Sequence, residues 1–310
     1  MTPDITVDPP RCVNKALFIR HLHTGPDPTG KRAWKETVVP QHADHADHAD
    51  RVGPPSRRLL MMEGRALFEL GAFWASLPWL RSLPKGDGRP VLALPGLAAS
   101  DISTRPMRGF LKDRGYRAYG WDQGRNLGLR PGLLDGMLDR LDAVADRHGV
   151  TVSLVGWSLG GVFARELAKL RPERVRQVVS MGSPFTGNRR ASHAWQFYEL
   201  AAGHKVDRPP LKTTLDEPPP VPTTSIYSRS DGIVAWQCCH QTGHAHVENV
   251  EVEGSHCGLG HNPMVLYVLA DRLSQPEGDW QPFDRGGLRS VFFRDPGRDR
   301  MSECGPRARA

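Results

Sequence analysis

The sequence lacks both a long apolar run and a regular cysteine framework. No stretch of its 310 residues approaches the roughly 20 apolar residues that a membrane-spanning helix needs. Residues 1–20 contain Asp4, Asp8 and Arg11 and have no apolar centre, unlike a secretory signal peptide. The five cysteines are an odd number without regular spacing. These absences predict reduced thiols and a cytoplasmic location.

A dense run of basic residues interleaved with aromatic residues is also missing. The net charge of +7 comes from arginines that are spread along the chain, so we expect no nucleic-acid partner. The hydrophobic fraction of 39% and the charged fraction of 24% are those of a globular protein. A small molecule is the expected partner.

Residues 1–57 differ in composition from the rest of the chain. They are rich in Pro, Asp, His and Thr, and His-Ala-Asp occurs three times within residues 42–50. This composition predicts a disordered, low-complexity extension. The clustered His and Asp side chains have no apolar residues nearby to fix a ligand geometry, so we predict no metal site here. Met61 and Met62 are alternative candidates for the start of the functional chain.

From residue 58 onward, apolar runs of strand length alternate with segments of helical periodicity. The expected strands are residues 90–94, 116–121, 151–155, 175–181, 224–228 and 247–253. The expected helices are residues 59–83, 105–114, 133–148, 162–170 and 264–273. This alternation predicts an α/β domain over residues 58–273, with a mainly parallel sheet flanked by helices. Residues 274–310 are expected to form a polar tail.

Two segments have an additional expected role. Residues 59–83 are apolar and helical, which fits packing on the catalytic domain and, as the less common alternative, peripheral contact with a lipid surface. Residues 186–222 interrupt the strand–helix alternation with an aromatic-rich helix at 191–202 and a proline-rich run. We interpret this insertion as a small helical lid over a substrate pocket, with an inert surface excursion as the less favoured alternative.

The most informative motif is Gly156-Trp157-Ser158-Leu159-Gly160, which lies between an apolar strand and a helix. A serine on such a strand-to-helix turn presents its hydroxyl beyond the end of the sheet. The flanking glycines are expected where the turn packs backbone against backbone. Ser158 is therefore the predicted nucleophile.

A serine hydroxyl needs a histidine to accept its proton and a carboxylate to orient that histidine. Asp231 follows the expected strand 224–228, whereas the rival carboxylates Asp216 and Glu217 lie in the proline-rich insertion without a preceding strand. Asp231 is therefore the predicted acid.

His256 follows the expected strand 247–253 among small residues and is the predicted base. His261 is its competitor, but His261-Asn262-Pro263 is typical of a helix start. Cysteines and histidines around residues 238–257 are numerous enough for zinc, yet their spacing matches no paired Cys-x-x-Cys framework. We predict no metal and no cofactor.

An oxyanion hole requires two backbone N–H groups that point at the same oxygen. The residue after the nucleophile, Leu159, is one expected donor. Leu97, in the turn after the first core strand, is the other. Trp157, Trp195 and Trp236 are expected to line a hydrophobic substrate pocket.

Residues 88–273 resemble the α/β-hydrolase superfamily, and the lipase- and esterase-like serine hydrolases in particular. The resemblance is carried by the motifs at 94–97, 156–160, 227–231 and 254–256. It implies a catalytic triad of Ser158, Asp231 and His256 and cleavage of carboxylic esters with a hydrophobic acyl group. Alternatives are an acyltransferase or thioesterase with the same triad, and a non-catalytic binding protein on this fold. Pro95-Gly96 stands where many relatives have His-Gly.

Overall fold

The computed structural model describes residues 17–26, 32–39, 52–207, 214–242 and 244–296. Its centre is a six-stranded sheet in which every neighbouring pair of strands is parallel, in the order β4-β3-β5-β6-β7-β8. The strands are β3 (Pro90–Leu94), β4 (Arg117–Gly120), β5 (Val152–Trp157), β6 (Val175–Met181), β7 (Thr223–Tyr227) and β8 (Val247–Glu251). The predicted fold class is confirmed.

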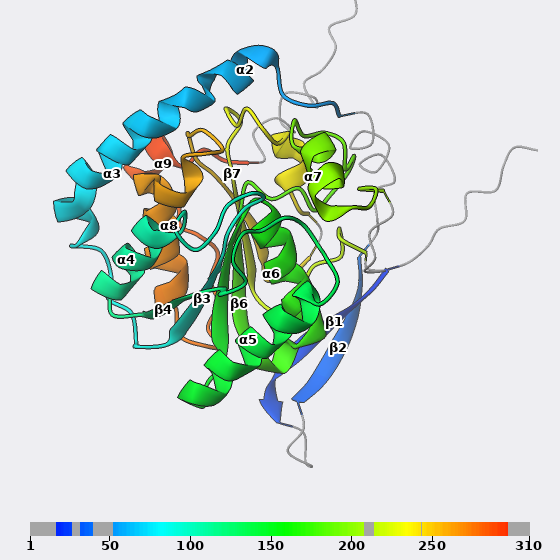
Figure 1. Cartoon of the computed structure of the whole chain (residues 1–310). Coiled ribbons are helices and arrows are strands. Elements are labelled where there is room, and N and C mark those ends of the chain that lie inside the picture. Colours follow the sequence, from blue (N-terminus) through cyan, green and yellow to red (C-terminus); the bar gives the residue numbers. More distant parts are fainter. Residues whose placement is uncertain (1–16, 27–31, 40–51, 208–213, 243, 297–310) are drawn as a thin grey trace, which may run out of the picture.

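Helices cover both faces of this sheet (Figure 1). On one face lie α3 (Ala66–Leu80), α4 (Arg105–Asp113) and α8 (Pro263–Ser274), and on the other lie α5 (Leu133–His148) and α6 (Leu159–Leu170). The remaining helical segments are α2 (Arg57–Met61), η1 (Met62–Arg65), η2 (Pro172–Arg174), α7 (Trp195–Ala202), η3 (Trp236–Cys239), η4 (Leu259–His261) and α9 (Arg289–Phe292).

The apolar strands are buried on both faces because successive side chains point to opposite sides of a strand. In β3, Val91 and Ala93 join the cluster under α3, α4 and α8, whereas Leu92 and Leu94 join the cluster under α5 and α6. A continuous apolar run in the sequence is therefore what a central parallel strand requires.

The turn between β5 and α6 is packed so closely that only glycine fits at two of its positions. A Cβ atom on Gly156 would lie 2.3 Å from the carbonyl oxygen of Gly160. A Cβ atom on Gly160 would lie 2.3 Å from the carbonyl oxygen of Leu94 in β3. This contact holds the start of α6 against the neighbouring strand.

Two segments outside the sheet differ from the expectations. Within residues 1–57, expected to be disordered, β1 (Leu17–Pro26) and β2 (Arg32–Val39) pair as an antiparallel hairpin. The His-Ala-Asp repeat lies outside the described residues. In the expected polar tail, Phe283 and Phe293 are buried in the cluster formed with α8, with their ring centroids 4.8 Å apart.

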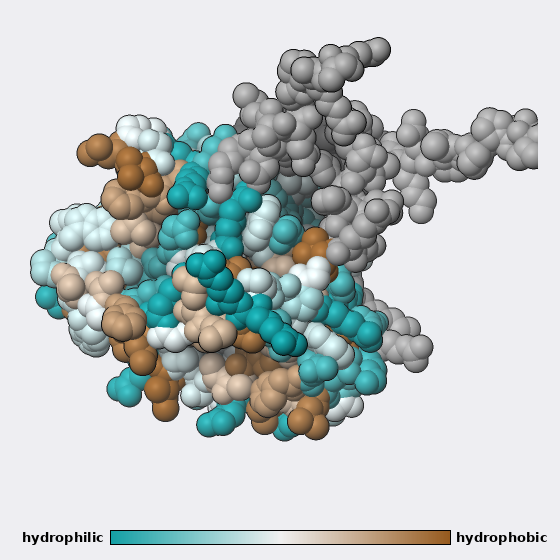
Figure 2. Space-filling model, turned by 90° about the horizontal axis from the view of Figure 1, so that it is seen from above, coloured by the Kyte–Doolittle hydropathy of each residue, from teal (hydrophilic) through white to brown (hydrophobic). Residues whose placement is uncertain are grey.

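Several apolar side chains of α3 face solvent, among them Leu67, Phe68 and Trp74. Seen from above, hydrophobic and neutral residues reach the surface on the left of Figure 2, the side on which α3 lies in Figure 1. Of the helices in the described part of the chain, none combines the length and apolarity that crossing a bilayer requires.

The close packing of the turn predicts the effect of enlarging Gly156. Gly156→Ala places a methyl group against backbone atoms 2.3 Å away, so we expect the free energy of unfolding to fall by about 1–3 kcal/mol. Gly109→Ala in α4 is the control, because no described atom beyond its chain neighbours and its own helix backbone lies within 4 Å of its Cβ position. A helical alanine there should stabilise by about 0.5–1 kcal/mol. Denaturant unfolding of both variants measures this, and equal stabilities would contradict it.

Candidate functional site

Ser158 occupies a strained backbone conformation at the carboxyl end of β5. Its φ of 55° and ψ of −123° lie in a region that residues other than glycine rarely adopt. The N–H group of Ser158 donates to the carbonyl oxygen of Met181 in β6 at 2.7 Å. Helix α6 begins at the next residue, so the serine is held between a strand and a helix N-terminus.

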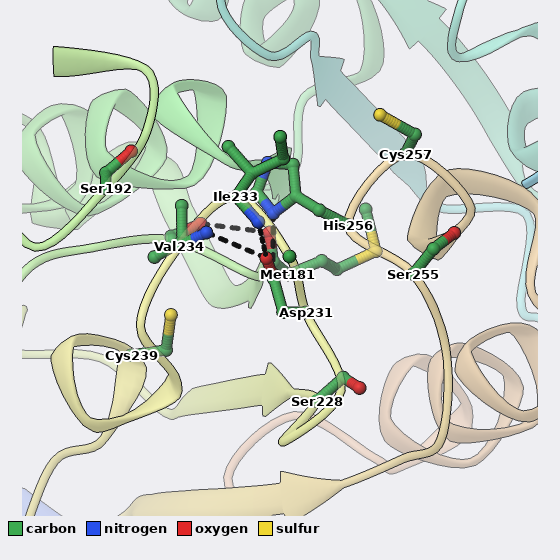
Figure 3. Close-up of polar contacts among 12 residues, drawn as sticks. Met181, Ser192, Ser228, Asp231, Ile233, Val234, Cys239, Ser255, His256 and Cys257 are labelled. Carbon is green, nitrogen blue, oxygen red and sulfur yellow. Dashed lines mark hydrogen bonds and ion pairs between the residues drawn. The ribbon is translucent and has the colours of Figure 1, made fainter. Parts of the chain in front are cut away.

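Asp231 follows β7 and is only 3% exposed. Its Oδ1 accepts hydrogen bonds from the N–H groups of Ile233 and Val234, both at 2.8 Å. Its Oδ2 accepts from Nδ1 of His256 at 2.6 Å (Figure 3). Both oxygens of this buried carboxylate therefore have donors, as burial of a charge requires.

His256 follows β8 and is 6% exposed. Because a carboxylate can only accept, the bond to Asp231 places the ring proton on Nδ1 and leaves Nε2 free to take a proton. Burial lowers the pKa of His256, but the charge of Asp231, its hydrogen bond and the charge of Glu63 outweigh this, so the pKa lies above its ordinary value. The pair has the arrangement of a general base with its orienting acid.

The indole of Trp157 connects the serine turn to the histidine loop. Its Nε1 donates to the carbonyl oxygen of His256 at 3.0 Å. Gly182, directly after β6, has its Cβ position 3.1 Å from Nδ1 of His256 and 3.2 Å from Oδ2 of Asp231. The three predicted triad residues thus lie at the same end of the sheet. Among the described residues, neither the Ser158 hydroxyl nor Nε2 of His256 makes a hydrogen bond.

The alternative site residues lie elsewhere. His261 places its Nε2 3.0 Å from the carbonyl oxygen of Ala66, where it joins η4 to the start of α3. Asp216 and Glu217 lie near Arg165 and His244, away from the bond between Asp231 and His256. In the part of the chain that the structure describes, no group of three or more His, Cys, Asp or Glu side chains is placed to hold a metal ion.

The expected oxyanion residues line the same cavity as Ser158. Leu97 and Leu159 both contact it, and a Cβ atom on Gly96 would lie 3.3 Å from Cβ of Ser158. The turn that carries Leu97 therefore packs directly on the serine.

Asn126 holds this turn in place. Reasoning from the sequence did not identify it as a positioning residue. It is fully buried, and its Nδ2 donates to the carbonyl oxygen of Pro95 at 2.8 Å. Its backbone pairs with the same turn through the N–H of Ala98 and the carbonyl of Ala99, at 2.7 and 2.8 Å. Its partners lie about 30 residues away in the chain, so no local motif in the sequence pointed to this role.

The cavity beside Ser158 is mainly apolar. Residues of α6 and of α7 both line it, among them Val162 and Trp195. Its apolar lining includes Leu97, Leu134, Met137, Val162, Phe163 and Trp195. Glu166, Arg189 and Tyr198 are among its polar or partly polar residues. Such a lining suits a hydrophobic group with few polar contacts.

The three tryptophans expected in the pocket have different surroundings. Trp195, on α7 of the expected lid segment, lines the cavity. Trp157 and Trp236 are not among its lining residues. Trp157 is turned toward the histidine loop by its bond to His256, and Trp236 stacks on Tyr227 with ring centroids 5.6 Å apart.

The expected lid segment contains α7, which starts at Trp195 and not at Ala191. Ala191 and Ser192 pair with the backbone around Val234, and this extended pairing prevents them from joining the helix. Residues 208–213 of the segment lie outside the described residues.

Glu63 is the second site residue that sequence reasoning missed. It belongs to η1 and accepts hydrogen bonds from the backbone N–H groups of Gly232, His256 and Cys257, at 2.7, 2.9 and 2.9 Å. Bonds between a side chain and a distant backbone leave no motif in the sequence, so no local signal pointed to it.

Comparisons with known proteins agree with this architecture. Residues 90–208 match the family model described as alpha/beta hydrolase fold. A 62-residue stretch is 42% identical to the pimeloyl-[acyl-carrier protein] methyl ester esterase of Nitrosomonas europaea. That match covers 20% of this chain and only 25% of the relative.

Two solved structures are similar at lower identity. Lipase B of Aspergillus fumigatus is 20% identical with a TM-score of 0.48, over 63% of this chain and 54% of the lipase. An alpha/beta superfamily hydrolase from Oenococcus oeni PSU-1 is 16% identical with a TM-score of 0.45, over 60% of this chain and 91% of that one.

The parallel sheet order, the strained serine between β5 and α6, and the match of residues 90–208 to the family model lead to one conclusion. The chain has the α/β-hydrolase fold, and its residues 90–208 match the model of that family.

Proposed function

We propose that this protein is a serine hydrolase that cleaves carboxylic esters with a hydrophobic acyl group through an acyl-enzyme on Ser158. The fold and the match to an esterase support an enzyme of the hydrolase type. The observation that carries the finer proposal is the buried bond of 2.6 Å between Asp231 and His256, at the end of the sheet where Ser158 is presented.

In the proposed first step, Oγ of Ser158 attacks the ester carbonyl while Nε2 of His256 accepts its proton. The bond from Nδ1 to Asp231 keeps the imidazole in the tautomer that can accept. The negative charge of Asp231 stabilises the imidazolium that forms. These roles use only groups of the chain itself.

The carbonyl oxygen gains negative charge as the tetrahedral intermediate forms. The backbone N–H groups of Leu97 and Leu159 are the proposed donors to it. A preorganised donor of this kind contributes about 3–4 kcal/mol to lowering the barrier. Asn126, which holds the 95–99 turn, keeps the Leu97 donor in place.

The intermediate collapses when His256 returns its proton to the leaving alcohol, and the acyl group stays on Ser158. Water then enters, loses a proton to His256 and attacks the acyl-enzyme. Free acid is released and Ser158 recovers its proton. The apolar cavity, which residues of α6 and α7 line, is the proposed site of the acyl group.

Replacing the nucleophile gives the most direct test. Ser158→Ala should reduce hydrolysis of a short p-nitrophenyl ester by about 10⁶-fold and abolish labelling by a fluorophosphonate probe, because no other group forms the acyl-enzyme. Ser274→Ala at the end of α8 is the control and should keep both activities. Full turnover by Ser158→Ala would remove this serine from the mechanism.

If added alcohols divert the product from free acid to new esters, the enzyme is an acyltransferase instead.

The raised pKa of His256 sets the expected pH dependence. The base must be neutral, so kcat/KM should rise with pH through a midpoint above the ordinary value of 6.5. Asp231→Asn removes the charge that raises this pKa. It also removes the carboxylate that keeps the ring proton of His256 on Nδ1. The midpoint should then move to lower pH and kcat should fall about 10³- to 10⁴-fold. A wild-type midpoint well below 6.5 would exclude His256 as the base.

A further inference from the structure

The segment formed by α2, η1 and α3, which we name the strap (residues 57–80), lies across the loops that follow β7 and β8 (Figure 1). The strap packs closely against the loop that follows β7 and carries Asp231 and Gly232. A Cβ atom on Gly232 would lie 2.3 Å from the carbonyl oxygen of Leu59. Gly232 directly follows the candidate acid, so the strap contacts the site without lining its cavity.

Glu63 is the residue through which the strap reaches both loops at once. Its Oε1 accepts from the N–H of Gly232 at 2.7 Å and from the N–H of His256 at 2.9 Å. Its Oε2 accepts from the N–H of Cys257 at 2.9 Å. One half-buried carboxylate thus binds the residue after the acid, the base itself and the residue after the base.

These bonds are of the stronger kind, because a charged acceptor makes hydrogen bonds roughly twice as strong as those between neutral groups. They also share one rigid planar carboxylate, so a displacement of either loop changes the geometry of both. Glu63 therefore couples the backbone position of the Asp231 loop to that of the His256 loop.

Neighbouring strap residues hold the outer parts of the same loops. Glu69 accepts from the N–H and the hydroxyl of Ser255, at 2.8 and 2.6 Å. Arg65 donates to the carbonyl oxygen of Ser230 at 2.7 Å and pairs with Glu69 at 3.4 Å. The strap therefore fixes residues on both sides of the pair that Glu63 holds.

We propose that Glu63 is a positioning residue that holds the loops of Asp231 and His256 in the geometry needed for proton transfer from Ser158. The inference rests on the proposed function. It assigns to the strap a role in catalysis that acts through the backbone and not through contact with substrate.

The charge of Glu63 also acts on the imidazole. After the lowering effect of burial, Asp231 and then Glu63 raise the pKa of His256. Further titratable groups around the loop are Arg65, Glu69, Cys239 and Cys257. Arg65 and Glu69 form an ion pair, and both thiols stay protonated at neutral pH. Cys257 is exposed, yet the protein around its thiol desolvates it and, with Glu63, raises its pKa to about 12.

Glu63→Gln tests this role because it keeps the shape of the side chain and removes its charge. The NH2 group of the amide must take the place of one carboxylate oxygen, so it faces at least one backbone N–H as a second donor and the loops shift. We expect kcat/KM for a p-nitrophenyl ester to fall by about 10- to 100-fold, chiefly in kcat. The midpoint of the acidic limb should move to lower pH, because one of the charges that raise the pKa of His256 is gone. Glu63→Asp keeps the charge and shortens its reach, so kcat should fall while the midpoint stays near that of the wild type.

The matched control is Glu253→Gln, which removes a carboxylate from the loop before His256. Its side chain is 62% exposed, and it contacts Ser230 and Arg294 but no backbone N–H of the pair. Both kcat and the pH midpoint should remain those of the wild type. Thermal unfolding and fluorophosphonate labelling show that each variant is folded and has an intact nucleophile.

The outcomes separate this inference from the proposed function. A wild-type protein that neither labels nor hydrolyses overturns both. Labelling and hydrolysis by the wild type, with Glu63→Gln within twofold of it and with an unmoved pH midpoint, overturns only the role of Glu63. If Glu63→Gln does not fold, Glu63→Asp decides: a reduced kcat with unchanged KM supports the role, and wild-type kcat overturns it.

Discussion

The contact of backbone against backbone at the turn between β5 and α6 is the constraint on which the candidate site depends. Gly156 and Gly160 let the start of α6 lie against its neighbours without side chains between them. Ser158 is then forced into a conformation that costs about 1–3 kcal/mol. The burial of the neighbouring strands offsets this cost in free energy. The Ser158 hydroxyl is thereby held beyond the end of the sheet.

The rest of the site follows from the parallel direction of the strands, since β5, β7 and β8 all end at the same edge of the sheet. This places Ser158, Asp231 and His256 together although long stretches of chain separate them. Direction alone does not fix loops to the precision that proton transfer needs. Glu63 binds the backbone of the loops after β7 and β8, and Asn126 binds that of the 95–99 turn; we propose that these bonds add the precision.

Much of this was predictable from the sequence because burial leaves a pattern. The apolar runs predicted β3 and β6 with their observed bounds, and the helical stripe predicted α5 at residues 133–148. The triad candidates followed from their positions after strands. Asn126 and Glu63 were not found, because a side chain that binds a distant backbone looks like any polar residue in the sequence. Nor does the type of a residue tell which way it points, and Trp157 and Trp236 accordingly lie outside the cavity that Trp195 lines.

The position of the strap in the chain has a consequence for how the molecule assembles. The partners of Glu63 are 169, 193 and 194 residues further along the sequence. Contacts that close such long loops form slowly and late, because chain entropy must be lost before they stabilise the fold. During synthesis the strap leaves the ribosome long before β7 and β8 exist. The candidate site is therefore complete only once β8 has been made.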